Sequence, residues 1–353
     1  MVGRAFHLAA LSALEREVGW RADQASIVVG TSAGSLTGAC IRAGASIDDL
    51  VCEATHGDLR SAGGMLAELG PAPRPPAPTF DFGSPPLSLR HLAARARDDT
   101  PLPWIAAASC FIPRGRGCTD EHAAWVDRLI DAPWPGRELW VCAVEMPSLQ
   151  RVVWGRSPGQ DPTIGEAVAA SCAIPGYLAP RTHEGREFVD GGIHSPTNAD
   201  VLAGERLDLV IVSSPMSAVD TSATAPTDRI TRRFRRRLLH QEALTLRRDG
   251  TRVVTIEPTA ADLEAMRSHR IHEPLPEGLI DELRTGIRAR IRDGEFDALH
   301  ERANYSSTTI RGGGGNEQGG SAPATDLLAL TVPASTSRAA PRPGSDHRPS
   351  PDR

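Results

Sequence analysis

A short buried strand, a glycine-flanked serine and a helix follow one another without a break near the start of the chain. Residues Ser26 to Val29 are apolar and mostly β-branched, which is typical of a strand buried in a parallel sheet. The sequence Gly30-Thr31-Ser32-Ala33-Gly34 follows at once, and the pattern predicts a helix from Ala33 to Arg42 with Gly44 as its left-handed cap. Such a strand–turn–helix unit belongs to a layered α/β sheet.

The rest of the chain repeats this alternation of short apolar strands and helices. The pattern predicts a hairpin from Glu138 to Trp154, a helix that begins at the capping box of Thr163 and Glu166, and a strand that ends at Asp190. Further on it predicts a strand at Leu207 to Val212, an arginine-rich helix at Thr227 to Arg248 and a strand at Arg252 to Ile256. We therefore expect an α/β fold with a mostly parallel central sheet.

Composition divides the chain into one domain and a tail. We expect a single domain over residues 1–311, in which the proline-rich stretch 57–104 forms a cap-like excursion over the surface. From residue 312 the sequence is rich in Gly, Ser and Pro, and large apolar residues are few, so that residues 312–353 are predicted to be a disordered tail. The stretch Leu327 to Leu330 is a small apolar island in this tail, too short to fold alone.

The chain contains no lysine, and this absence excludes whole classes of chemistry. All 39 basic residues are arginine. A P-loop, a protein kinase, a pyridoxal-phosphate enzyme and a serine–lysine dyad each need a lysine. Arginine cannot replace it as a base or nucleophile, because its pKa stays above about 12.

We expect no metal and no cofactor. The six cysteines form no Cys-x-x-Cys pair and have no metal-type spacing, as is typical of buried thiols in a reducing cytoplasm. No stretch approaches the roughly 18 uninterrupted apolar residues of a membrane span. The predicted location is therefore the cytoplasm, with peripheral contact to a membrane surface as an option.

The motif at Ser32 is a candidate nucleophile elbow. Gly30-Thr31-Ser32-Ala33-Gly34 has the form G-x-S-x-G between a strand and a helix, which is the context that an elbow requires. Small neighbours let the serine backbone take a strained turn that projects the hydroxyl from the end of the sheet. The alternative is an ordinary glycine-rich turn, or an anion site, in which Ser32 only caps the helix.

A nucleophilic serine needs a base, and Asp190 is the best candidate. It ends a predicted strand and is followed by Gly191 and Gly192, so that another segment can approach closely. Burial would raise its pKa and let it accept a proton. The alternative is that Asp190-Gly191-Gly192 is a common tight turn. His194 is the only histidine worth testing, and its other reading is a packing role.

Taken together, the two motifs resemble the patatin-like phospholipase family, over residues 2 to about 265. The segments that carry the resemblance are Gly30–Ser35, Ala169–Pro175, Val189–Gly192 and Ser195–Asp200. The resemblance implies a three-layer α/β/α fold and metal-free hydrolysis of lipid or phospholipid acyl esters. It also implies Ser32 as the nucleophile and Asp190 as the proton acceptor. Acyltransferases of the related fold are an alternative, but they carry histidine where Thr31 stands.

One departure from the family concerns the oxyanion hole. Members place a first strand and a glycine-rich loop before the opening helix, whereas this sequence begins with Met1-Val2-Gly3-Arg4 at the point where that loop should end. Only Gly3, together with Ala33, is left to supply oxyanion N–H groups. Either the recorded start is internal to the gene, or the copy is degenerate. The alternative function is therefore a catalytically impaired lipid-binding or scaffold protein.

The predicted helix at 227–248 is basic and amphipathic. Arg232, Arg233 and Arg236 lie on it beside apolar residues, a pattern suited to an anionic membrane surface. The plain alternative is the solvated face of a packed helix. Nucleic acid is not an expected partner, because the pI of the chain is about 6.1.

Overall fold

The computed structural model describes most of the chain up to residue 296. The described ranges are 2–56, 68–74, 80–81, 114–130, 134, 138–146, 148–157, 159, 161–222, 224–267, 273, 275–296, 299 and 326–330. The predicted cap-like excursion at 57–104 therefore lies outside the described residues, apart from 68–74 and 80–81.

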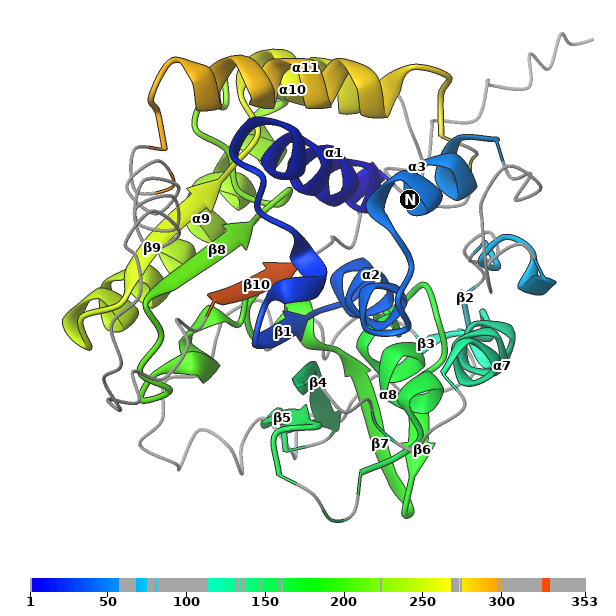
Figure 1. Cartoon of the computed structure of the whole chain (residues 1–353). Helices are drawn as coiled ribbons and strands as arrows, with labels where there is room; N and C mark the ends of the chain where they lie inside the picture. Colours follow the sequence, from blue (N-terminus) through cyan, green and yellow to red (C-terminus); the bar gives the residue numbers. More distant parts are fainter. Residues whose placement is uncertain are drawn as a thin grey trace, which may run out of the picture.

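A mixed β-sheet forms the centre of the described fold (Figure 1). Its strand order is β6-β7-β4-β1-β10-β8-β9, and β5 pairs with β4. Neighbours from β4 to β9 run parallel, whereas β5, β6 and β7 make antiparallel pairs. The strands are β1 (Ile27–Gly30), β4 (Glu138–Met146), β5 (Arg151–Trp154), β6 (Arg181–His183), β7 (Arg186–Asp190), β8 (Leu209–Ser213), β9 (Arg252–Ile256) and β10 (Asp326–Leu330). A separate antiparallel pair consists of β2 (Phe80–Asp81) and β3 (Arg114–Gly115).

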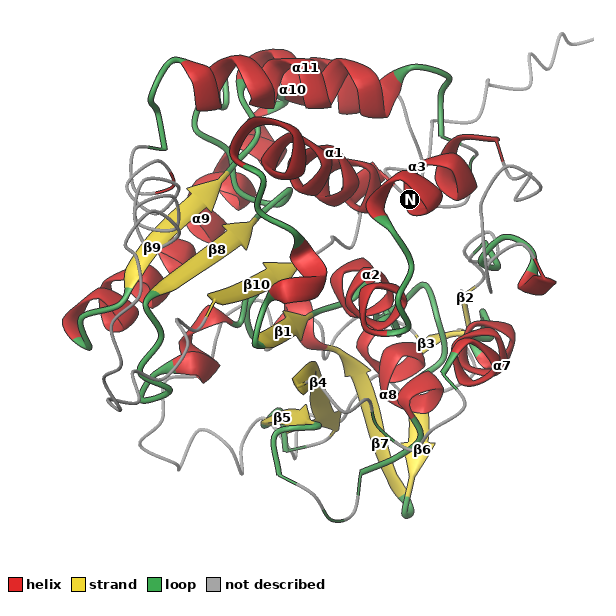
Figure 2. Cartoon of the chain, viewed as in Figure 1, coloured by secondary structure: helices red, strands yellow, loops and turns green. Residues whose placement is uncertain are grey.

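Helices lie on both sides of this sheet (Figure 2). They are α1 (Val2–Val18), α2 (Ala33–Arg42), α3 (Ile47–His56), α7 (Asp120–Leu129), α8 (Ile164–Ser171), α9 (Pro226–Arg248), α10 (Ala260–Met266) and α11 (Leu279–Arg292). Short 3₁₀ helices are η1 (Ala22–Gln24), η3 (Gly191–Ile193) and η4 (Ala199–Leu202). The predicted capping box is confirmed: Thr163 Oγ1 accepts from the Glu166 amide at 3.1 Å, and Glu166 Oε2 accepts from the Thr163 amide at 3.2 Å.

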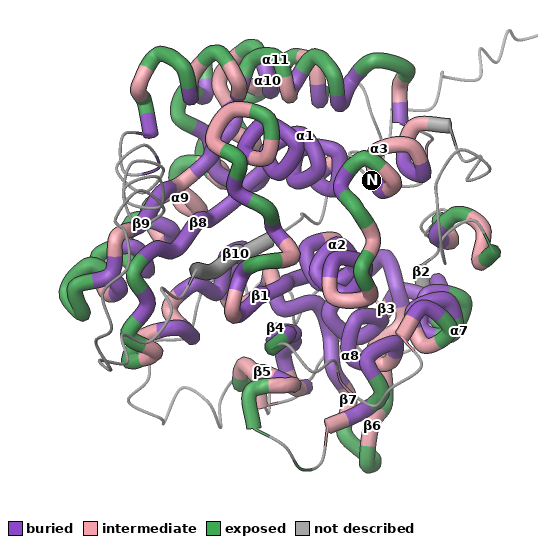
Figure 3. The backbone as a smooth tube through the Cα atoms, in the orientation of Figure 1, coloured by how far each residue is buried: buried purple, intermediate pink, exposed green. Residues whose placement is uncertain are grey.

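Alternating side chains of the strands explain the three layers. On β1, Val28 packs into the apolar cluster shared by α1, α2, α8 and α11. Its neighbours Ile27 and Val29 point the other way, into a cluster formed with α9 and η4. Both faces of the central strands are thus buried, as the purple strands of Figure 3 show. The predicted α/β fold is confirmed, with a helical layer on each side of the sheet.

The strand β10 is a departure from the prediction for the tail. The composition predicts that Asp326–Leu330 belongs to a disordered segment, but the structure places it between β1 and β8, where it runs parallel to both. Five residues are too few to be stable alone, whereas two flanking strands satisfy the backbone of β10 along both of its edges. The other residues of 312–353 lie outside the described part of the chain, so that their disorder stays a prediction.

Candidate active site

Ser32 sits at a strained turn between β1 and α2. Its backbone has φ 56° and ψ −127°, a combination that few non-glycine residues adopt. Gly30 makes the turn possible, because a Cβ atom at this position would lie 2.4 Å from Cα of Ser35. Surrounding structure must hold such a conformation in place. The turn at Gly30 and Ser32 therefore has the strained form that a nucleophile elbow requires, and the catalytic role of the motif Gly30, Thr31, Ser32, Ala33 and Gly34 stays a prediction.

The register of the sheet brings Asp190 to the level of Ser32. Gly30 of β1 pairs with Val141 of β4, and Asp190 of β7 pairs with Ala143 of the same strand. Ala143 lies two residues beyond Val141, just as Ser32 lies two residues beyond Gly30. The two candidate residues therefore flank β4 at the same height, although 158 positions of sequence number separate them.

The glycines after Asp190 allow the close approach that the sequence predicts. A Cβ atom on Gly191 would lie 2.4 Å from the carbonyl oxygen of Cys142 and 3.1 Å from the Thr31 side chain. The Gly192 amide donates to Asp190 Oδ1 at 2.7 Å. With any larger residue in place of Gly191, this loop could not lie against both β4 and the elbow.

The carboxyl group of Asp190 is buried and has a free oxygen. The residue is only 4% exposed, and Oδ2 has no hydrogen bond of ordinary geometry within the described residues. Burial raises the pKa of Asp190 to about 7, although the Gly192 amide, the Ser32 hydroxyl and Arg235 act in the opposite direction. The Ser32 hydroxyl is thus close enough to affect the carboxyl group. A base with a pKa near neutrality is well matched to proton transfer from serine.

Ser171, the last residue of α8, holds the elbow in place. The Ser32 amide donates to Ser171 Oγ at 2.9 Å, and that hydroxyl donates to the Cys142 carbonyl at 2.7 Å. This chain of bonds ties the elbow to α8 and β4. The segment Ala169–Pro175 carries the family resemblance, but the sequence alone gave Ser171 no role.

Asn198 ties the elbow to the Asp190 loop. Its Nδ2 donates to Thr31 Oγ1 at 3.0 Å and to the Ser195 carbonyl at 2.6 Å, and it lies 3.4 Å from the Gly191 carbonyl. The residue has a left-handed backbone (φ 47°), which asparagine tolerates better than most residues. These hydrogen bonds explain why Asn198, a polar residue, is fully buried.

Comparison with known protein families gives one match, which covers part of the chain. A family model described as patatin-like phospholipase matches residues 143–203. The resemblance to the patatin-like family is confirmed. The matched residues run from β4 to the end of η4, so that they include Asp190, Ser171 and Asn198 but not Ser32. A search of the curated proteins finds no match to the chain.

Two backbone N–H groups, those of Gly3 and Ala33, are the predicted oxyanion donors of the candidate site. Ala33 begins α2, and its amide has no acceptor among the described residues, as expected for the first turn of a helix. Gly3 is buried in the first turn of α1. One turn later, His7 Nδ1 lies 2.9 Å from Ser213 Oγ at the carboxyl end of β8. The start of α1 therefore lies at the same edge of the sheet as Ser32.

The remaining candidates for catalysis are His194 and the cysteines. His194 follows η3, and its amide donates to the Gly191 carbonyl at 3.0 Å. Burial raises the pKa of the Cys40, Cys142 and Cys172 thiols to about 12, so that they stay protonated. Within the described ranges, no group of three or more His, Cys, Asp or Glu side chains is arranged to hold a metal ion.

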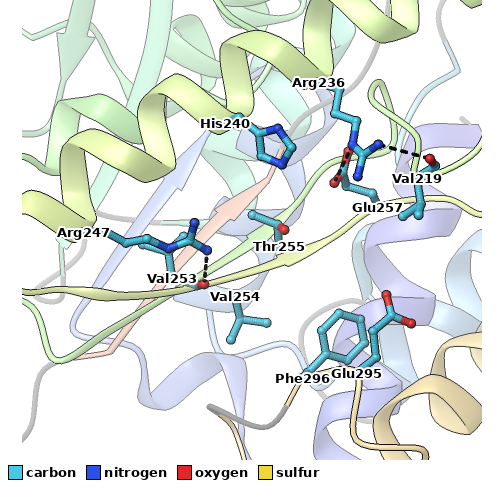
Figure 4. A pocket seen from close by; sticks show the side chains of 10 residues that line it. All are labelled: Val219, Arg236, His240, Arg247, Val253, Val254, Thr255, Glu257, Glu295 and Phe296. Atoms are coloured by element: carbon cyan, nitrogen blue, oxygen red, sulfur yellow. Dashed lines mark hydrogen bonds and ion pairs between the residues drawn. The ribbon is translucent and has the colours of Figure 1, made fainter.

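A separate cavity of about 290 Å³ lies between α9 and β9 (Figure 4). Arg236, His240 and Arg247 of α9 line it together with Thr255 of β9 and Phe296. Two of these arginines are engaged: Arg236 donates to the Val219 carbonyl at 3.1 Å, and Arg247 donates to the Val253 carbonyl at 3.0 Å. Neither Ser32 nor Asp190 lines this cavity, so it is distinct from the candidate active site.

Proposed function

We propose that the chain is a serine-dependent acyl-ester hydrolase that acts on lipids through Ser32 and Asp190. The observation that carries the proposal is the pairing of a strained serine with a buried carboxyl group whose Oδ2 is unoccupied among the described residues. The patatin-like family match supports a lipid acyl hydrolase in general. The choice of Ser32 and Asp190 rests on their geometry.

The first half of the reaction acylates the serine. Ser32 Oγ attacks the carbonyl carbon of the ester, and Asp190 Oδ2 accepts the hydroxyl proton. Negative charge develops on the former carbonyl oxygen, which the Ala33 amide, the Gly3 amide and the positive end of the α2 dipole would stabilise. When the C–O bond to the alcohol breaks, Asp190 returns the proton to the leaving alkoxide.

The second half releases the acid. A water molecule takes the place of the alcohol, and Asp190 accepts its proton while the oxygen attacks the acyl carbon of Ser32. Collapse of this intermediate breaks the bond to Oγ, and the proton on Asp190 restores the Ser32 hydroxyl. One carboxyl group thus acts as base and acid in turn, for which a pKa close to the working pH is best.

The pH dependence of hydrolysis tests this role. Because Asp190 must be ionised to accept a proton and its pKa is about 7, kcat/KM for an uncharged short-chain ester should rise with pH and level off above 7. Below that value the rate should fall about tenfold for each pH unit. Initial rates across the pH range would measure the curve. A profile that levels off near the ordinary pKa of an aspartate would contradict the raised pKa of Asp190, and a rate that does not change with pH would contradict a carboxyl group as the base.

We further propose that the exposed face of α9 contacts anionic membrane surfaces. Of the three arginines singled out by the sequence, Arg232 donates to the carbonyls of Pro215 and Ser217, and Arg236 donates to that of Val219. Arg233 is exposed. It lies on one helix face with Ile230, which is 66% exposed. The same face continues through exposed Arg237 and Leu244.

Vesicle binding tests this surface. The double variant Arg233→Gln/Arg237→Gln should reduce co-sedimentation with vesicles rich in phosphatidylglycerol, because each basic residue near an anionic surface contributes about 1 kcal/mol. Binding to pure phosphatidylcholine vesicles serves as the control and should not change. Equal binding of the variant and the natural sequence to anionic vesicles would leave α9 as a packed helix with a solvated face.

None of the described helices combines the length and the hydropathy needed to cross a bilayer. A cytoplasmic location with peripheral membrane contact stays a prediction. The proposed surface requires only that α9 lie on a membrane.

A further inference from the structure

Glu242 is a buried acid on the inward face of α9, where the other buried residues are all apolar. Its side chain accepts hydrogen bonds from the segment that leads into η4. Oε1 accepts from the Ser195 hydroxyl, and Oε2 accepts from the Thr197 hydroxyl and, at 3.1 Å, from the Ala199 amide. A buried carboxylate is costly unless such donors satisfy it, so that α9 and this segment depend on each other.

The bonds to Glu242 fix a backbone that is neither helix nor strand. Asn198 has a left-handed conformation (φ 47°), which surrounding contacts must hold in place. The Ser195 hydroxyl supplies two of these contacts, because it accepts from the Asn198 amide at 3.2 Å and from the Thr197 amide at 3.3 Å. Glu242 orients that hydroxyl by accepting its proton. The amides of Asn198 and its two neighbours thus all donate to Ser195 Oγ or to Glu242.

This segment reaches both halves of the proposed dyad through the side chain of Asn198. Arg151 Nη1 donates to Asn198 Oδ1 at 3.2 Å, which identifies the acceptor end of the amide. The other end, Nδ2, lies 3.0 Å from Thr31 Oγ1 and 3.4 Å from the Gly191 carbonyl. Thr31 directly precedes the proposed nucleophile, and Gly191 directly follows the proposed base. One amide therefore links the two turns that carry the dyad.

We propose that Glu242 is a positioning residue for hydrolysis, which holds Asn198 in place and so fixes the separation of Ser32 and Asp190. This inference rests on the proposed function. A base must lie within hydrogen-bond distance of the hydroxyl whose proton it accepts. A misplacement of about 1 Å can lower the rate about 100-fold. Glu242 takes no proton from the substrate and acts on the rate only through the bonds that Asn198 makes.

Hydrolysis of a chromogenic butyrate ester, measured above the pKa of Asp190, tests this role. Glu242→Leu has no acceptor for the three donors, and we expect it to lower kcat about 10- to 100-fold while KM changes less than about threefold. Glu242→Gln keeps the shape and one acceptor oxygen, so it should recover most of the loss. The same two changes at Glu282, which is exposed on α11, are the matched controls and should leave kcat unchanged.

A double-mutant cycle separates positioning from a general loss of stability. Thr31→Val removes the hydroxyl to which Asn198 Nδ2 donates. Because Glu242→Leu loosens the same link, the double variant should lose clearly less activity than the product of the two single losses. Losses that multiply in full would show that Glu242 acts independently of the link. That result would overturn the inference, and so would a folded Glu242→Leu variant with unchanged kcat.

The activity of the natural sequence distinguishes this inference from the proposed function. If the natural sequence does not hydrolyse the ester, the proposed function fails and the inference fails with it. If it does, and the variants of Glu242 keep its kcat, only the inference fails. Should Glu242→Leu not fold, Thr197→Val decides, because it removes a single donor to Glu242 at nearly constant volume. It should lower kcat about 3- to 10-fold, and an unchanged kcat would overturn the inference.

Discussion

Replacing Ser32 with alanine is expected to lower kcat/KM for a short-chain ester by about 10⁴- to 10⁶-fold, because no other group at the elbow can form the acyl intermediate. The loss should lie almost entirely in kcat, since the hydroxyl contributes little to binding of the ground state. Steady-state hydrolysis of a chromogenic butyrate ester measures it. A residual rate within tenfold of the natural sequence would mean that another residue is the nucleophile.

A matched control guards against a trivial loss of folding. Ser26 precedes β1 at the opposite end of the strand from Ser32, and Ser26→Ala makes the same chemical change there. Its rate should stay close to that of the natural sequence. Serine and alanine both carry a Cβ atom, so the strained backbone at position 32 costs about the same free energy in either protein. Ser32→Ala should therefore unfold at a temperature similar to that of the natural sequence. A large drop in its melting temperature would make the activity result uninformative about chemistry.

Replacing Asp190 with asparagine is expected to lower kcat/KM by about 10²- to 10⁴-fold, the usual contribution of a general base. The amide has nearly the same shape as the carboxyl group and can still accept from the Gly192 amide, so that the loop after β7 should persist. The rise of activity through pH 7 should also disappear, because the group that titrates there is gone. A variant that keeps the pH profile of the natural sequence would exclude Asp190 as the base.

Asp190→Asn should lower activity but favour stability as the pH rises, so that a loss of catalysis can be told apart from a loss of folding. The folded-state pKa of Asp190 is raised from 3.8 to about 7, so the folded protein binds the proton more tightly than the unfolded chain does. By linkage, Asp190 makes the natural sequence lose stability as the pH rises from about 4 to about 7. The uncharged amide of the Asp190→Asn variant carries no such cost. The difference in melting temperature between the variant and the natural sequence should therefore move in favour of the variant across this window, while activity falls.

Local patterns predicted most of the elements around the site. The strand at 26–29, the helix Ala33–Arg42 and the capping box at Thr163 are each specified by residues close together in sequence, and the structure places them as expected. The dyad could be predicted because glycines mark both turns. At Gly30 and Gly191 a side chain would collide with the backbone, and such a requirement leaves a visible signal in the sequence.

Contacts between distant segments were beyond the reach of the sequence. Ser171 and Asn198 hold the elbow through bonds that span 139 and 167 residues, and nothing local distinguishes them from other buried polar residues. The inward position of Glu242 was equally hidden, because α9 is rich in charged residues and only packing decides which one faces the sheet. The strand β10 depends on its two neighbours for stability, so its own five residues predicted only a short apolar island.

Labelling with a fluorophosphonate probe tests the Ser32–Asp190 assignment most directly. The probe modifies only an activated serine, and the chain has no lysine, so trypsin releases Ser32 in the arginine-terminated peptide of residues 22–42. We predict an adduct on Ser32 of the natural sequence, located by fragment masses that distinguish it from Ser26 and Ser35. Labelling should be absent in Ser32→Ala and strongly slowed in Asp190→Asn. No labelling of the natural sequence, or an adduct on another serine, would contradict the assignment, and the first of these results would favour a lipid-binding scaffold without catalysis.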